Sequence, residues 1–166
     1  MKVQITKRAD GGTVLKCIRA DGSETWQKLM GGQGAFFPLH DLTHFAVESE
    51  LGLSSAFYGL IASGWSIEDT TGKGTRGALP EEALFAENVV GTLDGERAGG
   101  TRWTAAEFNY GLVLTAALQG RPAPRELTDD ELARVRKRRA ELFAQWNELP
   151  PGQTLELTFD PQRTAP

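Results

Sequence analysis

Cysteine and histidine are scarce in this chain of 166 residues, which has one cysteine, Cys17, and two histidines, His40 and His44. A single cysteine excludes an internal disulfide, and no apolar segment near Met1 has the form of a signal peptide. Both observations favour a reducing, cytoplasmic location. Cys17 lies in a strand-like run with no histidine close to it in sequence, so we interpret it as a small strand residue and not as a nucleophile.

Long apolar runs and an excess of positive charge are missing as well. No stretch approaches the roughly 20 apolar residues that cross a bilayer, so we expect no membrane span. A net charge of −4 argues against a nucleic-acid partner, because such partners are bound mainly by a basic face. The 40% of hydrophobic and 24% of charged residues are those of a globular protein, and a length of 166 residues predicts a single domain over residues 1–166.

Three strand-like runs open the sequence and predict a β-meander over residues 1–30. The strands are expected at Lys2–Arg8, Thr13–Arg19 and Glu24–Leu29. The segments "KRADGGTV" and "IRADGSET" place Asp-Gly between these strands, which favours type I′ turns. Near the other end, "TLELTFD" alternates apolar and polar residues, and this alternation predicts a half-buried strand at 154–160 that returns to the meander.

The middle of the chain, residues 38–148, is predicted to be mostly helical. Proline, glycine and capping-box signals give helices at Pro38–Leu51, 55–64, Pro80–Gly91, 104–119 and Thr128–Glu148. The apolar stretch 112–118 predicts that the fourth helix runs through the core, and "LDGERAGGTRW" (93–103) is interpreted as a loop. The predicted class is α+β, with a small antiparallel sheet, made of the meander and the C-terminal strand, packed against four to five helices.

Both histidines share one helix face with two acidic residues. At about 100° per residue, His40, His44, Glu48 and Asp41 lie within an arc of about 100°, and nearly all the remaining surface is apolar. Such a helix is usually buried, so its polar groups need a metal, a hydrogen-bond network or water as partners. In the alternative interpretation, His40 and Asp41 cap the first turn of the helix, and His44 is a core histidine bonded to a backbone carbonyl.

Two histidines four residues apart can aim two ring nitrogens at one ion. The chain has no third histidine, and its cysteine lies in a predicted strand, so the third protein ligand has to be a carboxylate. Glu48 follows on the same helix face, and Glu87 is the better candidate on another helix. Weaker candidates are Glu68, Asp69 and Glu107. Two histidines and one carboxylate suit a divalent zinc, iron or manganese ion.

Several families share parts of this motif. The segment "HDLTH" resembles the HExxH helix of zinc metallopeptidases, with Asp41 in place of the general-base glutamate, so its reach toward a metal-bound water is about an ångström shorter. "HDxxH" is similar to a motif of a ubiquinone-biosynthesis family, whose later glutamate is replaced here by Ala56. HD-type phosphohydrolases share the "HD" pair but need further histidines. As a whole, "PLHDLTHFAVE" resembles a bacterial family to which no activity is attached.

These patterns support two hypotheses. The first is a metal-dependent enzyme of hydrolase type that acts on a small molecule. In it, His40 and His44 hold the ion together with Glu48 or Glu87, and Asp41 orients a histidine or accepts a proton from metal-bound water. The second is a non-catalytic domain that binds a small ligand or a protein partner and uses the same helix face as a buried hydrogen-bond network.

Arg139 bears on the question of an oligomer, which the sequence leaves open. It stands in line with the apolar Val135 and Leu142 on the last predicted helix. A charged residue on an apolar stripe needs a partner, so we expect Arg139 either to pair with a carboxylate or to lie at a subunit contact.

Overall fold

The computed structural model of this chain describes residues 1–72 and 74–162, apart from the side chains of residues 33 and 35. Within this part of the chain, four antiparallel strands form one sheet in the order β3-β2-β1-β4. The strands are β1 (Lys2–Lys7), β2 (Thr13–Ile18), β3 (Glu24–Leu29) and β4 (Thr154–Thr158). The N-terminal meander and the returning C-terminal strand are therefore confirmed, and β4 pairs with β1 along its whole length.

The two hairpin turns are tight, but they are not the type I′ turns that Asp-Gly favoured. In the first, the Arg8 amide donates to Gly12 O at 2.9 Å and the Gly11 amide donates to Arg8 O at 3.2 Å. Gly11 has φ 78°, whereas no residue other than glycine has a positive φ in the part of the chain that is described. Each hairpin is thus a three-residue loop with a left-handed glycine at its end. The Asp10 carboxylate contributes by accepting the Gly12 amide at 3.1 Å.

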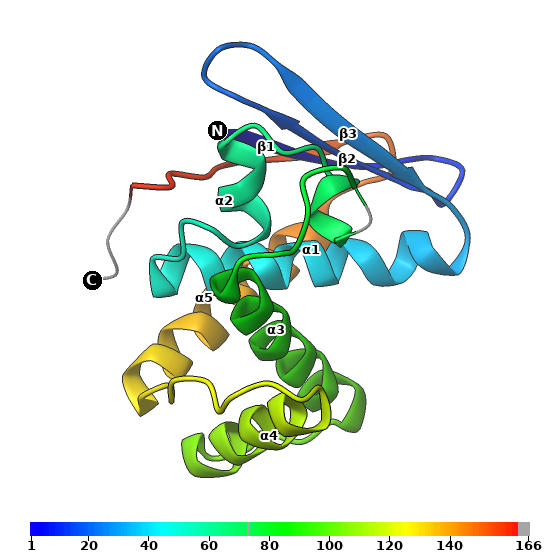
Figure 1. The fold of residues 1–166 in the computed structure, drawn as a ribbon. Coiled ribbons are helices and arrows are strands. Elements are labelled where there is room, and N and C mark those ends of the chain that lie inside the picture. The colour runs from blue at the N-terminus through cyan, green and yellow to red at the C-terminus, as the bar shows by residue number, and fades with distance from the viewer. Residues whose placement is uncertain (73, 163–166) are drawn as a thin grey trace.

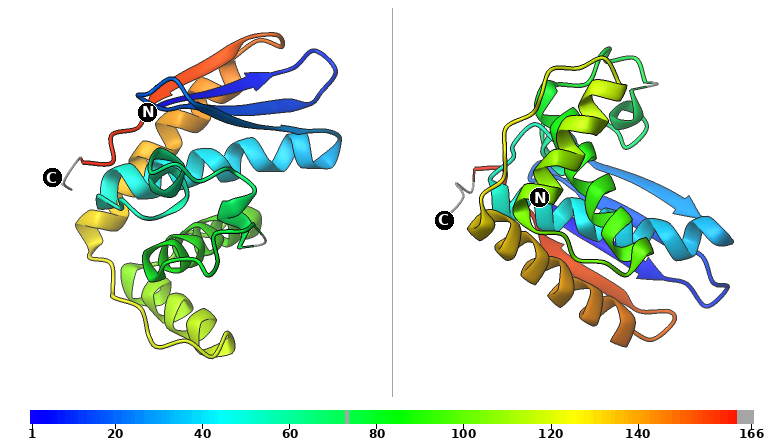
Figure 2. Two further views of the ribbon diagram at one scale, coloured as in Figure 1. Left: turned by 45° about the horizontal axis from the view of Figure 1, so that its top comes forward. Right: turned by 90° about the horizontal axis from the view of Figure 1, so that it is seen from below.

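Helices make up the rest of the architecture. They are α1 (Gly32–Leu51), α2 (Phe57–Ala62), α3 (Glu81–Gly99), α4 (Ala105–Leu118) and α5 (Asp129–Glu148), with a short 3-10 turn, η1 (Asp69–Thr71). Helices α1 and α5 lie against one face of the sheet, and α3 and α4 lie on the other side of α1 (Figure 1, Figure 2). The class is α+β, as predicted. Among the described residues, no helix combines the length and the hydropathy that a bilayer crossing requires.

Helix α1 separates two hydrophobic clusters and contributes to both. Toward the sheet, Leu42 and Phe45 pack with β-strand residues such as Ile5, and toward α3 and α4, Val47 and Leu51 pack with a second set of apolar side chains. These four α1 side chains are at most 7% exposed. This position explains why α1 is apolar on almost every side, and it confirms the prediction that the helix is buried.

Two predicted helix boundaries were wrong. Helix α1 begins at Gly32, so Pro38 lies inside it and not in its first turn. A proline inside a helix removes one hydrogen bond, but it does not prevent the turn before it from being helical. Helix α3 continues past Gly91 to Gly99. Gly91 and Gly95 therefore lie inside α3, and the Trp103 ring lies 3.8 Å from the position of a Cβ at Gly95, which is an ordinary van der Waals distance.

Helix α4 is not the core helix that its composition suggested. Phe108 and Leu112 are buried, but Tyr110 is 70% and Leu118 is 81% exposed. The helix packs on α3 through one side only, so its other side stays open despite its apolar side chains. Hydrophobic content alone overestimated burial here, because it does not specify how many neighbours a helix has.

Cys17 offers a test of the core. It is 0% exposed within the sheet, and burial raises the pKa of its thiol to about 12. We expect its reaction with a thiol reagent at pH 8 to be at least about 100-fold slower in the native protein than in urea, because reaction requires the core to open. Equal rates in both conditions would show that the sheet does not cover Cys17.

Candidate metal centre

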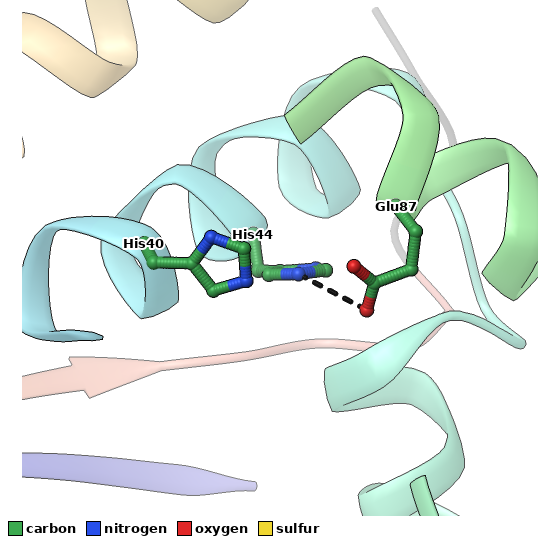
Figure 3. Close-up of side chains that lie close together, drawn as sticks. All are labelled: His40, His44 and Glu87. Atoms are coloured by element: carbon green, nitrogen blue, oxygen red, sulfur yellow. Dashed lines mark ion pairs between the residues drawn. The ribbon is translucent and has the colours of Figure 1, made fainter. Parts of the chain in front are cut away.

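Helix α1 brings His40 and His44 together on one face, one turn apart (Figure 3). Their ring centroids are 4.8 Å apart, with the ring planes at 74°. The His44 side chain is 2% exposed, whereas that of His40 is 21% exposed. Because α1 begins at Gly32, both histidines lie well inside the helix. His40 and Asp41 therefore do not cap its first turn, and that alternative was wrong.

Glu87 reaches the two histidines from α3 (Figure 3). Its Oε1 atom lies 3.4 Å from Nε2 of His44. One potential ligand atom from each of His40, His44 and Glu87 lies within 4.8 Å of the others. Two atoms bound to the same tetrahedral ion at about 2.1 Å are about 3.4 Å apart, so these three side chains are close enough to hold a metal ion. The position of Glu87 follows from its neighbour Ala86, a small buried residue that lets α3 pack closely on α1.

Asp94 fixes the orientation of the His40 ring. Its Oδ2 atom is 2.9 Å from Nδ1 of His40, so Nε2 is the ring nitrogen left for a ligand. The other oxygen, Oδ1, accepts a hydrogen bond from Nη2 of Arg139 at 3.2 Å. Nε of Arg139 also donates to the Thr43 hydroxyl at 3.0 Å. The expected carboxylate partner of Arg139 is thus Asp94, and a carboxylate behind a histidine is the usual support of a metal ligand.

Glu48 lies on the opposite edge of the His44 ring from Glu87. Its Oε1 atom is 3.4 Å from Nδ1 of His44, and neither atom has a hydrogen-bond partner among the described residues. Its Oε2 atom accepts the backbone amides of Tyr58 at 2.8 Å and of Gly59 at 3.2 Å, at the start of α2. The structure therefore brings Glu87 to Nε2 of His44 and Glu48 to Nδ1. Of the two carboxylates, only that of Glu87 belongs to the cluster with both histidines among the described residues.

Asp41 completes the wall of a small cavity next to these side chains. The cavity has a volume of about 140 Å³, and its lining residues include His40, His44, Glu87 and Asp41, together with Phe57, Ile67, Thr70 and Thr71. Asp41 is 4% exposed, and within the described residues its carboxylate makes no hydrogen bond. Burial raises the pKa of Asp41 to about 7, although both imidazoles act in the opposite direction. A buried carboxyl group without a partner is costly unless something in the cavity binds it.

The carboxylates on both edges of the His44 ring favour its protonated form. Burial alone would lower its pKa, but the carboxylates of Glu48 and Glu87 on its two edges outweigh burial and raise the pKa to about 10. An ion that binds Nε2 has to displace this proton, so metal binding and proton release are coupled. Within the part of the chain described, His44 donates to no backbone carbonyl, in contrast to the alternative interpretation of a core histidine.

The weaker candidates lie in other local structures. Glu107 closes the capping box of α4, where its Oε2 accepts the Thr104 amide at 2.8 Å. Asp69 accepts the backbone amide and the hydroxyl of Ser66 at 3.0 and 2.8 Å. Glu68 is exposed at the start of η1. The residue that sequence reasoning missed is Asp94, because it fell in a predicted loop. A continued helical period from Glu87 would have placed it two turns further along the same face of α3.

Comparison with protein-family models, with curated proteins and with solved structures gave no match. The resemblance of "PLHDLTHFAVE" to a bacterial family therefore stays a prediction, and the chemistry of the site has to be inferred from its own residues.

Glu48 provides a test of how the site is supported. Replacing it by alanine leaves two buried amides at the start of α2 without an acceptor, and we expect a loss of about 1–3 kcal/mol in the free energy of unfolding measured in urea. Glu148→Ala, at the exposed end of α5, is the matched control and should change stability by less than about 0.5 kcal/mol. Equal stability of the two variants would contradict the role given to Glu48.

Proposed function

We propose that the chain binds one divalent metal ion through His40, His44 and Glu87 and uses it to hydrolyse a small-molecule substrate. The observation that carries the proposal is the direction of the ligand atoms. Carboxylates lie against Nδ1 of both rings, so Nε2 of each histidine is the nitrogen left for a ligand, and Nε2 of His44 faces Glu87. Three protein ligands leave at least one coordination position open, which is typical of catalytic and not of structural sites.

The cavity supports a reaction at this position. A metal ion bound by His40, His44 and Glu87 would make a bound water molecule acidic enough to act as a nucleophile near neutral pH. Asp41 lines the same cavity and has no other hydrogen-bond partner among the described residues. We assign to its carboxylate the transfer of a proton from the attacking water to the leaving group, which makes it the general acid and base of the proposed hydrolysis.

The proposed metal site is also open to solvent, as a substrate requires. Glu87 lines the small cavity and, in addition, a larger hollow of about 550 Å³ between α3 and α4. Its side chain is 46% exposed, so the ion would be in contact with solvent on this side. The donor set suits zinc and non-haem iron, with manganese as a third candidate.

One observation favours the second hypothesis, a non-catalytic binding domain. The chain of hydrogen bonds from His40 through Asp94 and Arg139 to Thr43 is complete without an ion. In that case the cavity would accept a small neutral ligand, and His44 would keep its proton between two carboxylates. Metal content separates the two hypotheses.

Metal analysis is the first test of the proposal. Protein purified without a histidine tag should contain about one equivalent of zinc, iron or manganese by elemental analysis. His44→Ala and Glu87→Gln should lose it and keep the native circular dichroism spectrum, because each removes one ligand of the cluster. Glu81→Gln changes an exposed glutamate of the same helix and should keep the metal. Metal-free wild-type protein that also binds no added zinc would support the second hypothesis.

Asp41 tests the reaction separately from the metal. In metal-loaded protein, we expect Asp41→Asn to keep the ion and to lower the rate of p-nitrophenyl acetate hydrolysis by about 100- to 10,000-fold, because an amide does not accept the proton. The control is Asp69→Asn, a carboxylate bonded within its own turn, which should keep both metal and rate. Unchanged hydrolysis in Asp41→Asn would remove Asp41 from the mechanism.

A further inference from the structure

A second concentration of charge lies near the candidate metal centre, and none of the three proposed metal ligands belongs to it. A surface hollow of about 350 Å³ is lined by four arginines and one acidic residue, Glu96, and its remaining lining residues are uncharged. The arginines are Arg97, Arg102, Arg136 and Arg139. Such a gathering of positive charge is unexpected in a chain with a net charge of −4, because the average surface of this protein is negative.

Two of the four arginine side chains are held in place by other protein groups. Arg136 makes an ion pair with Glu96, and its Nη2 also donates to Trp103 O at 2.8 Å. Arg139 is 9% exposed and is held by Asp94 and Thr43. Their side chains are thus oriented by protein groups, and the two carboxylates that neutralise them are already engaged.

The other two arginines have donors to spare. Within the described residues, Arg102 makes no ion pair and no hydrogen bond, although it lines the hollow. The guanidinium of Arg97 lies 5.7 Å from the centroid of the Phe36 ring, and it reaches Asp94 only through Nε, at 3.5 Å. Neither of its terminal nitrogens has a hydrogen-bond partner among the described residues. The hollow therefore contains two guanidinium groups in excess of the carboxylates, with their terminal N–H groups unused.

From this arrangement we infer that the hollow binds a phosphate group, free or as an ester. A phosphate dianion matches two uncompensated guanidinium groups in charge, and its oxygens accept the paired N–H donors of an arginine side chain. A carboxylate offers only one negative charge and fewer oxygens. The ring of Phe143 in the same hollow adds an apolar surface on which the organic part of an ester can lie.

Titration with two phosphate probes tests this inference. At constant ionic strength, inorganic phosphate and phenyl phosphate should each saturate one site by calorimetry, and acetate should bind at least tenfold more weakly. Arg102→Ala and Arg97→Ala should weaken both phosphate probes at least tenfold. The matched control is Arg138→Ala, which removes an arginine of α5 that pairs with Glu141 outside the hollow and should leave the affinity unchanged.

The outcomes are distinct. Tighter binding of phenyl phosphate would identify an ester as the ligand, and tighter binding of inorganic phosphate would identify the free ion; both support the site. Equal affinities in Arg102→Ala and Arg138→Ala, or acetate bound as tightly as phosphate, would overturn it. Because Arg102 has no partner in the described structure, its removal should leave the unfolding transition unchanged. None of the three proposed metal ligands lines the hollow, so the same titration in His44→Ala tests the phosphate site even if no metal is bound.

Discussion

The structure depends on one constraint, which is that a helix buried on nearly all sides also carries a stripe of ionisable side chains. Helix α1 packs on the sheet with one side and on α3 and α4 with another, so the groups on its polar stripe have little access to water. Each of them has to find a partner inside the protein or in the cavity. The positions of the surrounding helices can be understood from this requirement.

Neighbouring elements supply most of these partners. Helix α3 supplies Glu87 and Asp94 to the two histidines, and α5 supplies Arg139 to Asp94 and to Thr43 of α1. Helix α2 is tied to α1 through backbone amides that Glu48 accepts. The Asp41 carboxylate makes no hydrogen bond and no ion pair among the described residues, and it lines the cavity. The polar stripe thus holds the helices together and also leaves the Asp41 carboxylate at the wall of the cavity.

Local sequence signals predicted the elements that depend on local interactions. The capping boxes at Thr104 and Thr128 start α4 and α5 where expected, because a cap is formed by residues three positions apart. The alternation in "TLELTFD" predicted β4 and its return to the N-terminal sheet, and the structure shows that it pairs with β1. The i, i+4 spacing of His40 and His44 likewise fixed two of the three proposed ligands, since one helical turn brings them together whatever surrounds them.

The features that the sequence did not predict depend on tertiary packing. The helix was predicted to end at Gly91, with Gly95 in a following loop, but α3 stays helical past both glycines and ends at Gly99. Asp94 lay in that predicted loop, so its contact with His40 was not predicted. The sequence also could not decide whether Glu48 or Glu87 is the third proposed ligand. That choice depends on which edge of the His44 ring each carboxylate approaches, which only the tertiary structure shows. The prediction that α4 runs through the core failed for a similar reason. Tyr110 and Leu118 are exposed because no neighbouring element covers that side of α4 in the described structure.

Asp94 has its two oxygens on different neighbours, with Oδ2 on the imidazole of His40 and Oδ1 on the guanidinium of Arg139. A single planar group therefore separates the histidine pair from the arginine-lined hollow. Electrostatic influence can pass across it with no backbone movement, because a change of charge on one oxygen alters how strongly the other accepts a proton. If a metal ion at the histidines changes the affinity of the hollow for phosphate, then phosphate must change the affinity for the metal ion by the same factor, because the coupling free energy is reciprocal.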